Sequence, residues 1–188
     1  MTGPARKSDP YAELAALPAH VVGEIIEGTL HTHPRPALRH AQAASVLGEE
    51  LGPPFKRGRG GPGGWIILDE PELHLGRPPD ILVPDLAGWR RERVPVLPDS
   101  DHLELAPDWV AEVLSPSTQR VDRGLKRGIY RRERVAHVWL VDPAARTLEI
   151  FRLVGDEYLW VATYENDAVV RAEPFDAIEL QLGLLWQT

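Results

Sequence analysis

Short apolar runs typical of β-strands are the main pattern along the chain. Residues 109–114 (WVAEVL) are apolar on both faces apart from Glu112, and residues 136–142 (AHVWLVD) form a second run. A helical pattern lies between them, from SPST to about Arg134. A strand that is apolar on both faces is normally covered on both sides of its sheet, and a crossover helix joins strands that run parallel. The region therefore predicts a parallel strand–helix–strand unit.

More strands and one further long helix are predicted around this unit. Residues 21–33 favour a β-hairpin that turns at Glu27 and Gly28, and residues 36–51 have a partly helical spacing that ends at GPP. Shorter strands are indicated by WIILDEPELHL, by PPDILVPD and, in the C-terminal third, by LEIFRLV, EYLWVATY and AIELQL. This mixed order predicts an α/β domain, in which helices flank a central mixed β-sheet that follows an N-terminal β-hairpin.

Length and composition fit one folded unit. The chain has 188 residues, of which 43% are hydrophobic, so we expect a tail at residues 1–10 and a single domain at residues 11–188. The apolar runs are too short for a membrane span, and the N-terminus lacks the apolar block of a secretory signal. We therefore expect a cytoplasmic protein. Cysteine is absent, so a metal site would use oxygen or imidazole ligands.

Charge is distributed unevenly along the chain. The net charge is −7, but residues 120–134 hold seven basic and two acidic residues, a local charge of +5 that leaves −12 elsewhere. Phosphate groups could bind this predicted helix through Arg123, Arg127 and Arg131, although a solvated helix face explains the same charges. The glycine-rich segment at residues 55–65 is a second candidate, because this predicted loop carries the basic residues Lys56, Arg57 and Arg59.

Glu112 is the strongest candidate for a functional side chain. An ionised carboxylate buried in an apolar strand costs several kcal/mol unless it is paired or binds a metal ion. One interpretation is a buried ion pair with an arginine. The other is a hard-cation site shared with Asp80, which begins a neighbouring strand, since two carboxylates can bind Mg²⁺ and leave positions for water and phosphate. Asp80 alone also fits a strand-entry residue that hydrogen-bonds its own backbone.

One stripe of the predicted helix could complete such a site. Asp122, Lys126 and Tyr130 recur every four residues, beside a buried stripe of Val121, Leu125 and Ile129. A lysine at that border can reach a partly dry site. An ordinary ion pair between Asp122 and Lys126 is the simpler interpretation of the spacing.

These residues resemble the Uma-two family of endonuclease-like proteins, within the PD-(D/E)xK nuclease superfamily. The resemblance rests on PDILVPD, on EVLSPST followed by D-x₃-K-x₃-Y, and on VWLVDP, and it spans about Tyr11 to Trp186. GEIIEGTL and His40 also match the family pattern. The resemblance implies a restriction-endonuclease-like fold, a homodimer, and hydrolysis of DNA phosphodiester bonds that depends on Mg²⁺ or Mn²⁺.

The same resemblance implies roles for individual residues. Asp80 and Glu112 match the two acidic positions and would hold the metal ion, and Glu24 would complete the acidic cluster. Position 114 is leucine where a lysine is expected, so the lysine role passes to Lys126 on the helix. Asp122 and Tyr130 would hold this lysine in place.

The residues leave three functions open. The first is a metal-dependent endodeoxyribonuclease. The second is an inactive module with the nuclease fold that binds nucleic acid or a protein partner, which the negative net charge favours. The third is a hydrolase of a smaller phosphate ester. The spacing of His31 and His33 also permits zinc binding, but a surface pair beside prolines is the simpler interpretation.

Overall fold

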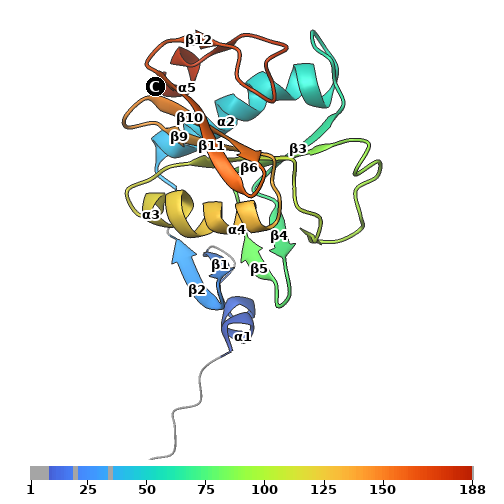
Figure 1. Cartoon of the computed structure of the whole chain (residues 1–188). Coiled ribbons are helices and arrows are strands. Elements are labelled where there is room, and N and C mark those ends of the chain that lie inside the picture. The colour runs from blue at the N-terminus through green and yellow to red at the C-terminus, as the bar shows by residue number, and fades with distance from the viewer. Residues whose placement is uncertain (1–8, 19–20, 34–35, 188) are drawn as a thin grey trace, which may run out of the picture.

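The structure is a computed structural model that describes residues 9–18, 21–33 and 36–187 (Figure 1). The tail predicted at residues 1–10 lies outside the described residues except for Asp9 and Pro10. Pro10 begins the first helix, α1 (Pro10–Ala15), and the side chain of Asp9 accepts a hydrogen bond from the backbone N–H of Tyr11. No described helix has both the length and the apolar character needed to cross a membrane.

The N-terminal hairpin belongs to a five-stranded sheet with the order β2-β1-β5-β4-β7. The predicted turn at Glu27 and Gly28 is confirmed, and both residues have positive φ angles. β4 and β7 are parallel, whereas the other pairs are antiparallel. The strands are β1 (Val22–Ile26), β2 (Thr29–His33), β4 (Glu72–Leu75), β5 (Asp80–Leu82) and β7 (His102–Leu103).

A second sheet of six strands, in the order β11-β10-β9-β8-β6-β3, forms the centre of the molecule. The predicted parallel pair is confirmed, because Trp109 to Val113 align with His137 to Val141 in the same direction. All other pairs in this sheet are antiparallel. The strands are β3 (Trp65–Asp69), β6 (Leu86–Arg90), β8 (Trp109–Val113), β9 (His137–Asp142), β10 (Thr147–Val154) and β11 (Glu157–Glu165).

Helices cover both faces of this sheet, as Figure 1 shows. On one face, helix α2 (Leu38–Leu51) contributes Leu47 to a core that includes Trp109 of β8. On the other face lies the helix between β8 and β9, formed by α3 (Gln119–Val121), the π-helical turn η2 (Asp122–Lys126) and α4 (Arg127–Arg132). The two apolar faces predicted for β8 are therefore explained by two separate cores. Glu112 belongs to the face that is covered by α3–α4.

Aromatic packing fixes the α2 side of the sheet. Trp109 and Trp139 meet edge to face with ring centroids 5.3 Å apart, and Phe175 packs against both rings at 4.9 and 5.6 Å. Such geometry adds about 0.5–1.5 kcal/mol per pair beyond the burial of the rings. The parallel strands β8 and β9 are thus held in register directly beside the position of Glu112.

The structure differs from the sequence-based prediction in three elements. The helix expected to end at GPP continues as the π-helical turn η1 (Gly52–Lys56), because Pro53 and Pro54 cannot donate regular helical hydrogen bonds and the wider turn is closed from the N–H of Arg57 to the carbonyl of Gly52. Strand β6 was not predicted. The segment AIELQL forms only the two-residue strand β13 (Leu180–Gln181), which pairs with β12 (Val169–Val170) and precedes α5 (Gly183–Trp186).

Candidate active site

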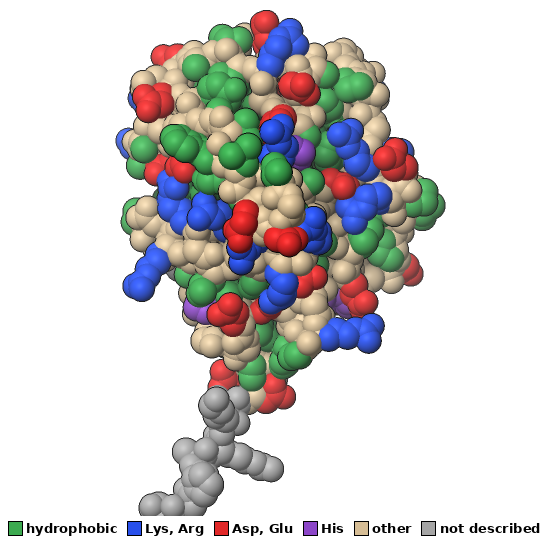
Figure 2. Space-filling view, viewed as in Figure 1, with side chains coloured by type: hydrophobic (Ala, Val, Ile, Leu, Met, Phe, Trp, Pro, Cys, Tyr) green, Lys and Arg blue, Asp and Glu red, His purple; other side chains and the backbone are tan. Residues whose placement is uncertain are grey.

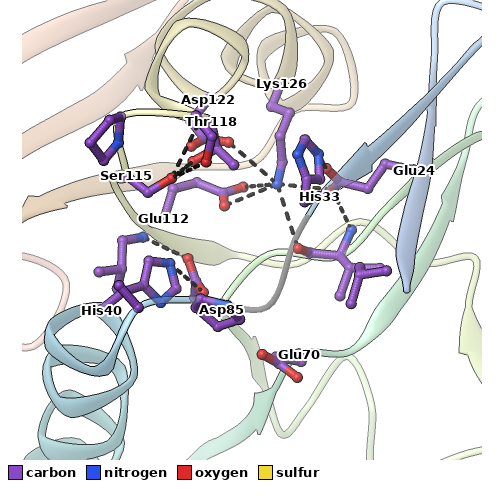
Figure 3. Close-up of a pocket in the computed structure, with 17 residues that line it drawn as sticks. Glu24, His33, His40, Glu70, Asp85, Glu112, Ser115, Thr118, Asp122 and Lys126 are labelled. Atoms are coloured by element: carbon purple, nitrogen blue, oxygen red, sulfur yellow. Dashed lines mark hydrogen bonds and ion pairs between the residues drawn. The ribbon is translucent and has the colours of Figure 1, made fainter. Parts of the chain in front are cut away.

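A pocket of about 320 Å³ opens where β8 ends and α3 begins (Figure 3). It lies at the carboxyl end of a parallel strand, which is where α/β sheets usually bind ligands. Its walls come from the hairpin, the first turn of α2, the loop before β6, and the SPST loop. The polar lining residues are Glu24, His33, His40, Glu70, Asp85, Glu112, Ser115, Ser117, Thr118, Asp122 and Lys126.

Glu112 and Lys126 form the centre of the pocket. Each residue is 2% exposed, and the Lys126 Nζ lies 2.9 Å from Oε1 and 3.0 Å from Oε2 of Glu112. The hydroxyl of Tyr130 donates a hydrogen bond to Glu112 Oε1. Tyr130 therefore orients the carboxylate, whereas the sequence predicted that it would hold the lysine. The partner of the buried Glu112 is a lysine from the crossover helix, and no arginine contacts it among the described residues.

Glu24 reaches the same lysine from the hairpin. Its Oε1 lies 2.9 Å from Lys126 Nζ and accepts a hydrogen bond of 2.8 Å from the N–H of Val83. Its Oε2 lies 3.0 Å from the Nε2 of His33. The structure thus places His33 in the wall of the pocket, although its position beside prolines favoured a surface side chain. Asp122 lies farther away, with Oδ1 3.7 Å from Lys126 Nζ.

The second acidic group beside Glu112 is Asp85, not Asp80. Strands β6 and β8 are antiparallel, and Leu86 pairs with Ala111. The residue before Leu86 therefore comes opposite Glu112. Asp85 Oδ2 accepts a hydrogen bond of 2.7 Å from the N–H of Val113, and Oδ1 lies 3.2 Å from His40 Nε2.

Asp80 does not line the pocket, so its expected position beside Glu112 is wrong. Its Oδ1 accepts a hydrogen bond of 2.6 Å from the N–H of Glu27, and its Oδ2 accepts one of 2.7 Å from Arg132. Both contacts join the hairpin, β5 and the end of α4. Asp80 is thus a structural residue at the start of a strand, but it binds the backbone of the hairpin and a helix arginine where the sequence favoured a bond to its own backbone.

The pocket holds more acidic than basic groups, and this excess shifts pKa values. Burial raises the pKa of Glu112 well above its usual range, the Lys126 charge opposes this, and the charges of Asp122, Asp85 and Glu24 add to it. Burial lowers the pKa of Lys126, but the nearby carboxylates more than compensate and hold it well above its usual range. Lys126 is therefore a permanent cation. Because burial and the neighbouring acidic groups raise the pKa of Glu112, a further positive charge beside Glu112 would stabilise its ionised form.

The oxygen atoms of these carboxylates are suitable ligands for a hard divalent cation. Asp85 and Glu112 lie opposite each other at the end of the β6–β8 pair, and both line the same pocket. No group of three or more His, Asp or Glu side chains in the described residues forms a ready-made metal cage. Mg²⁺ commonly uses one or two carboxylates and completes its shell with water and substrate oxygens. Asp85 and Glu112 fit that pattern.

The predicted phosphate-binding arginines of the helix are directed away from the pocket. Arg123 makes two hydrogen bonds with Glu149, Arg131 pairs with Glu157, and Arg127 stacks over the ring of Phe151. These contacts are with β10 and β11, and Figure 2 shows basic and acidic side chains interspersed on this face. Such pairing matches the solvated-face interpretation. Lys56 and Arg57 line a different hollow, and Arg59 lies in the adjoining glycine-rich loop.

We expect the stability contributed by Glu24 to depend on pH. Burial raises the pKa of Glu24, but the charge of Lys126 and hydrogen bonds from His33 and Val83 outweigh it and lower the pKa to about 2, from 4.5. The ionised form therefore stabilises the fold by about 3 kcal/mol above pH 4.5. This contribution is lost as the pH falls from 4.5 towards 2.

Urea unfolding of the wild type and of Glu24→Gln measures this effect. The difference in unfolding free energy between the two proteins should be largest near pH 6 and shrink steadily below pH 4.5. A difference that stays constant down to pH 2.5 would contradict the interaction between Glu24 and Lys126.

Comparisons with known proteins agree with this architecture. A sequence model of the Uma2 family, described as "putative restriction endonuclease", matches residues 11–184. No curated protein matches significantly. Among solved structures, a protein of Anabaena variabilis ATCC 29413, described as a "putative nuclease belonging to DUF820", has a similar fold with a TM-score of 0.74. The two chains are 22% identical, and the match covers 95% of this chain and 97% of the other. Because the family match spans nearly the whole length, the chain belongs to the Uma2 family.

Proposed function

We propose that this protein is a divalent-cation-dependent nuclease that hydrolyses phosphodiester bonds in DNA. The observation that carries the proposal is the arrangement in the pocket: Asp85 lies opposite Glu112, and the Lys126 Nζ lies 2.9 Å from Glu112. Two carboxylates can hold a metal ion, and a lysine beside them can neutralise charge that develops on a phosphate. The description of the family and of the similar structure agree with this chemistry.

Asp85 and Glu112 would hold the cation, Mg²⁺ or Mn²⁺. When bound, the cation supplies positive charge at the phosphate and favours ionisation of a water molecule. Lys126 donates hydrogen bonds towards the phosphate and neutralises charge that develops on it. Glu24 and Asp122 hold the lysine side chain in this direction, and Tyr130 fixes the orientation of Glu112. The pocket thus assigns binding, orientation and charge neutralisation to separate side chains.

A plasmid-nicking assay tests the proposal. The wild type should convert supercoiled DNA to open circles with Mg²⁺ or Mn²⁺ and not with EDTA. Glu112→Gln should lower the rate by roughly 1,000-fold or more, because it removes a charged ligand and keeps the shape of the side chain. Asp101→Asn, a change of one exposed carboxylate away from the pocket, is the matched control and should cleave normally.

Other outcomes identify the alternatives. Metal-dependent hydrolysis of a small phosphodiester without nicking would indicate a different substrate. DNA binding without any hydrolysis would indicate an inactive module with the nuclease fold. The homodimer implied by the family resemblance is part of the same proposal, and light scattering on the purified protein measures it.

A further inference from the structure

A second, smaller hollow lies directly beside the candidate active site. It has a volume of about 80 Å³ and is lined by Arg39 and Gln42 of α2, by Pro143 and Arg146 of the turn between β9 and β10, and by Leu185 and Trp186 of α5. Arg39 precedes His40, which lines the active-site pocket, and consecutive Cα atoms are about 3.8 Å apart. The first turn of α2 therefore forms a wall of both hollows.

The turn that carries Arg146 is firmly held. Asp142 Oδ1 accepts hydrogen bonds of 2.9 Å from the N–H groups of Ala144 and Ala145, and the carbonyl of Arg146 accepts one of 2.8 Å from Asn166. The indole N–H of Trp186 donates to the carbonyl of Asn166 at 2.8 Å. Trp186 and the backbone of Arg146 are thus both hydrogen-bonded to Asn166.

No carboxylate in the described part of the chain balances the charges in this hollow. None of the ion pairs formed between described residues includes Arg39 or Arg146, and none of the lining side chains is acidic. The arginines of the crossover helix differ, since acidic partners on β10 and β11 pair with Arg123 and Arg131. Within residues 9–18, 21–33 and 36–187, no acceptor occupies the guanidinium groups of Arg39 and Arg146, which can therefore bind a ligand.

We propose that Arg39, Arg146 and Gln42 bind one phosphate group of the nucleic-acid backbone, next to the phosphate that is cleaved. Guanidinium groups bind phosphate oxygens through two parallel hydrogen bonds, and the Gln42 amide adds a further donor. The hollow of about 80 Å³ leaves room for a phosphate group beside these donors. This inference rests on the proposed nuclease function, because it describes how the substrate of the same pocket is positioned.

Binding is measured without cleavage in a Glu112→Gln background, by fluorescence anisotropy of a labelled DNA duplex at several salt concentrations. Loss of one phosphate contact reduces the slope of log affinity against log salt by about 1. Both arginines bind the same phosphate, so each single variant, Arg39→Gln or Arg146→Gln, keeps one contact and should reduce the slope by less than 1, whereas the double variant should reduce it by about 1. Two independent contacts would instead reduce the slope by about 2 in the double variant.

The control is Arg131→Gln with Arg134→Gln, which removes the same charge from residues that pair with Glu157 and Asp156. Its slope should stay within error of the parent slope. The inference is overturned if the Arg39 and Arg146 double variant behaves like this control, if it reduces the slope by about 2, or if the parent does not bind DNA. A separate nicking assay of the wild type distinguishes the two proposals. If the wild type does not cleave DNA but binding depends on the two arginines, only the nuclease function is contradicted. If the wild type cleaves DNA and the arginine variants leave the salt slope unchanged, only the phosphate site is contradicted.

Discussion

Replacing Lys126 with methionine should abolish DNA cleavage and lower the free energy of unfolding by roughly 3–5 kcal/mol. Removal of one partner from a buried ion pair costs this much, because the remaining charge stays buried without compensation. Here the lysine contacts both Glu112 and Glu24, and Asp122 lies 3.7 Å away. Chemical unfolding measures the stability, and plasmid nicking measures the activity.

A second change separates the two effects. Combining Lys126→Met with Glu112→Gln removes one stranded carboxylate together with the lysine, so the double variant should regain part of the lost stability. It should still fail to cleave. Lys126→Arg should fold and cleave poorly, because the planar guanidinium does not replace a compact ammonium group. A Lys126→Met protein that is as stable and as active as the wild type would contradict the assignment of this side chain.

Leu114 occupies the position where the family resemblance led us to expect a lysine, and this allows a rescue experiment. Leu114 follows Glu112 by two residues, so its side chain lies on the same face of the sheet. Introducing Leu114→Lys into Lys126→Met should restore measurable but partial cleavage, because a charge returns to that face while a packed leucine is lost. Leu114→Met in the same background is the matched control and should restore nothing.

Most of the fold could be predicted because its main elements carry strong local patterns. The hairpin turn has Glu27 and Gly28 at the two positions with positive φ, and β8 is apolar on both faces. Strand β6 lacks such a pattern, since Gly88 interrupts five residues. The segment forms a strand because it has a partner on each side: β3 pairs with all five of its residues, and β8 pairs with Leu86 to Gly88. Pairing with strands that are distant in the sequence makes β6 a strand, and a short stretch of sequence does not contain that information.

The same missing strand explains the misplaced aspartate. PPDILVPD contains two Pro-Asp pairs, and the sequence pattern favoured Asp80, at the start of the predicted strand, for the site role. Only an antiparallel β6 beside β8 brings Asp85 opposite Glu112. An indication was present in the sequence, because Asp85 directly precedes the apolar segment LAGW. Lys126 could be proposed from the sequence, since the spacing of Asp122, Lys126 and Tyr130 along one helix is a local property.

The ion pairs of the surface arginines could not be predicted from the sequence for a related reason. Arg123, Arg127 and Arg131 share a helix stripe, and nothing local shows what lies opposite it. The partners Glu149 and Glu157 come from strands that follow in the chain. Arg39 and Arg146 are more than 100 residues apart and join one hollow only through the packing of α2 beside the β9–β10 turn. Local spacing therefore identified charged stripes and could not identify which charges remain available.

The two aspartates of PPDILVPD give the second large expected effect. Asp85→Asn should weaken Mn²⁺ binding by roughly 100-fold or more, since even the loss of an outer hydrogen-bond partner of a metal ligand costs 10–100-fold. Asp80→Asn should leave Mn²⁺ affinity unchanged. Asparagine at position 80 still accepts the hydrogen bond from Glu27 and loses the charge that faces Arg132, so stability should fall by only about 1 kcal/mol.

Calorimetric titration with Mn²⁺ measures both variants under the same conditions. The thermal midpoint provides an independent measurement, because a cation that binds only the folded protein raises the midpoint, and a tighter-binding cation raises it further at the same concentration. Mn²⁺ should therefore raise the midpoint of the wild type and of Asp80→Asn, and it should not raise that of Asp85→Asn. Each variant replaces one aspartate of the wild type with asparagine, and the two positions lie five residues apart in the chain. General effects of removing one negative charge therefore cancel when the two variants are compared. Equal loss in both would mean that Asp80 also reaches the cation, and loss in Asp80→Asn alone would restore the sequence-based assignment.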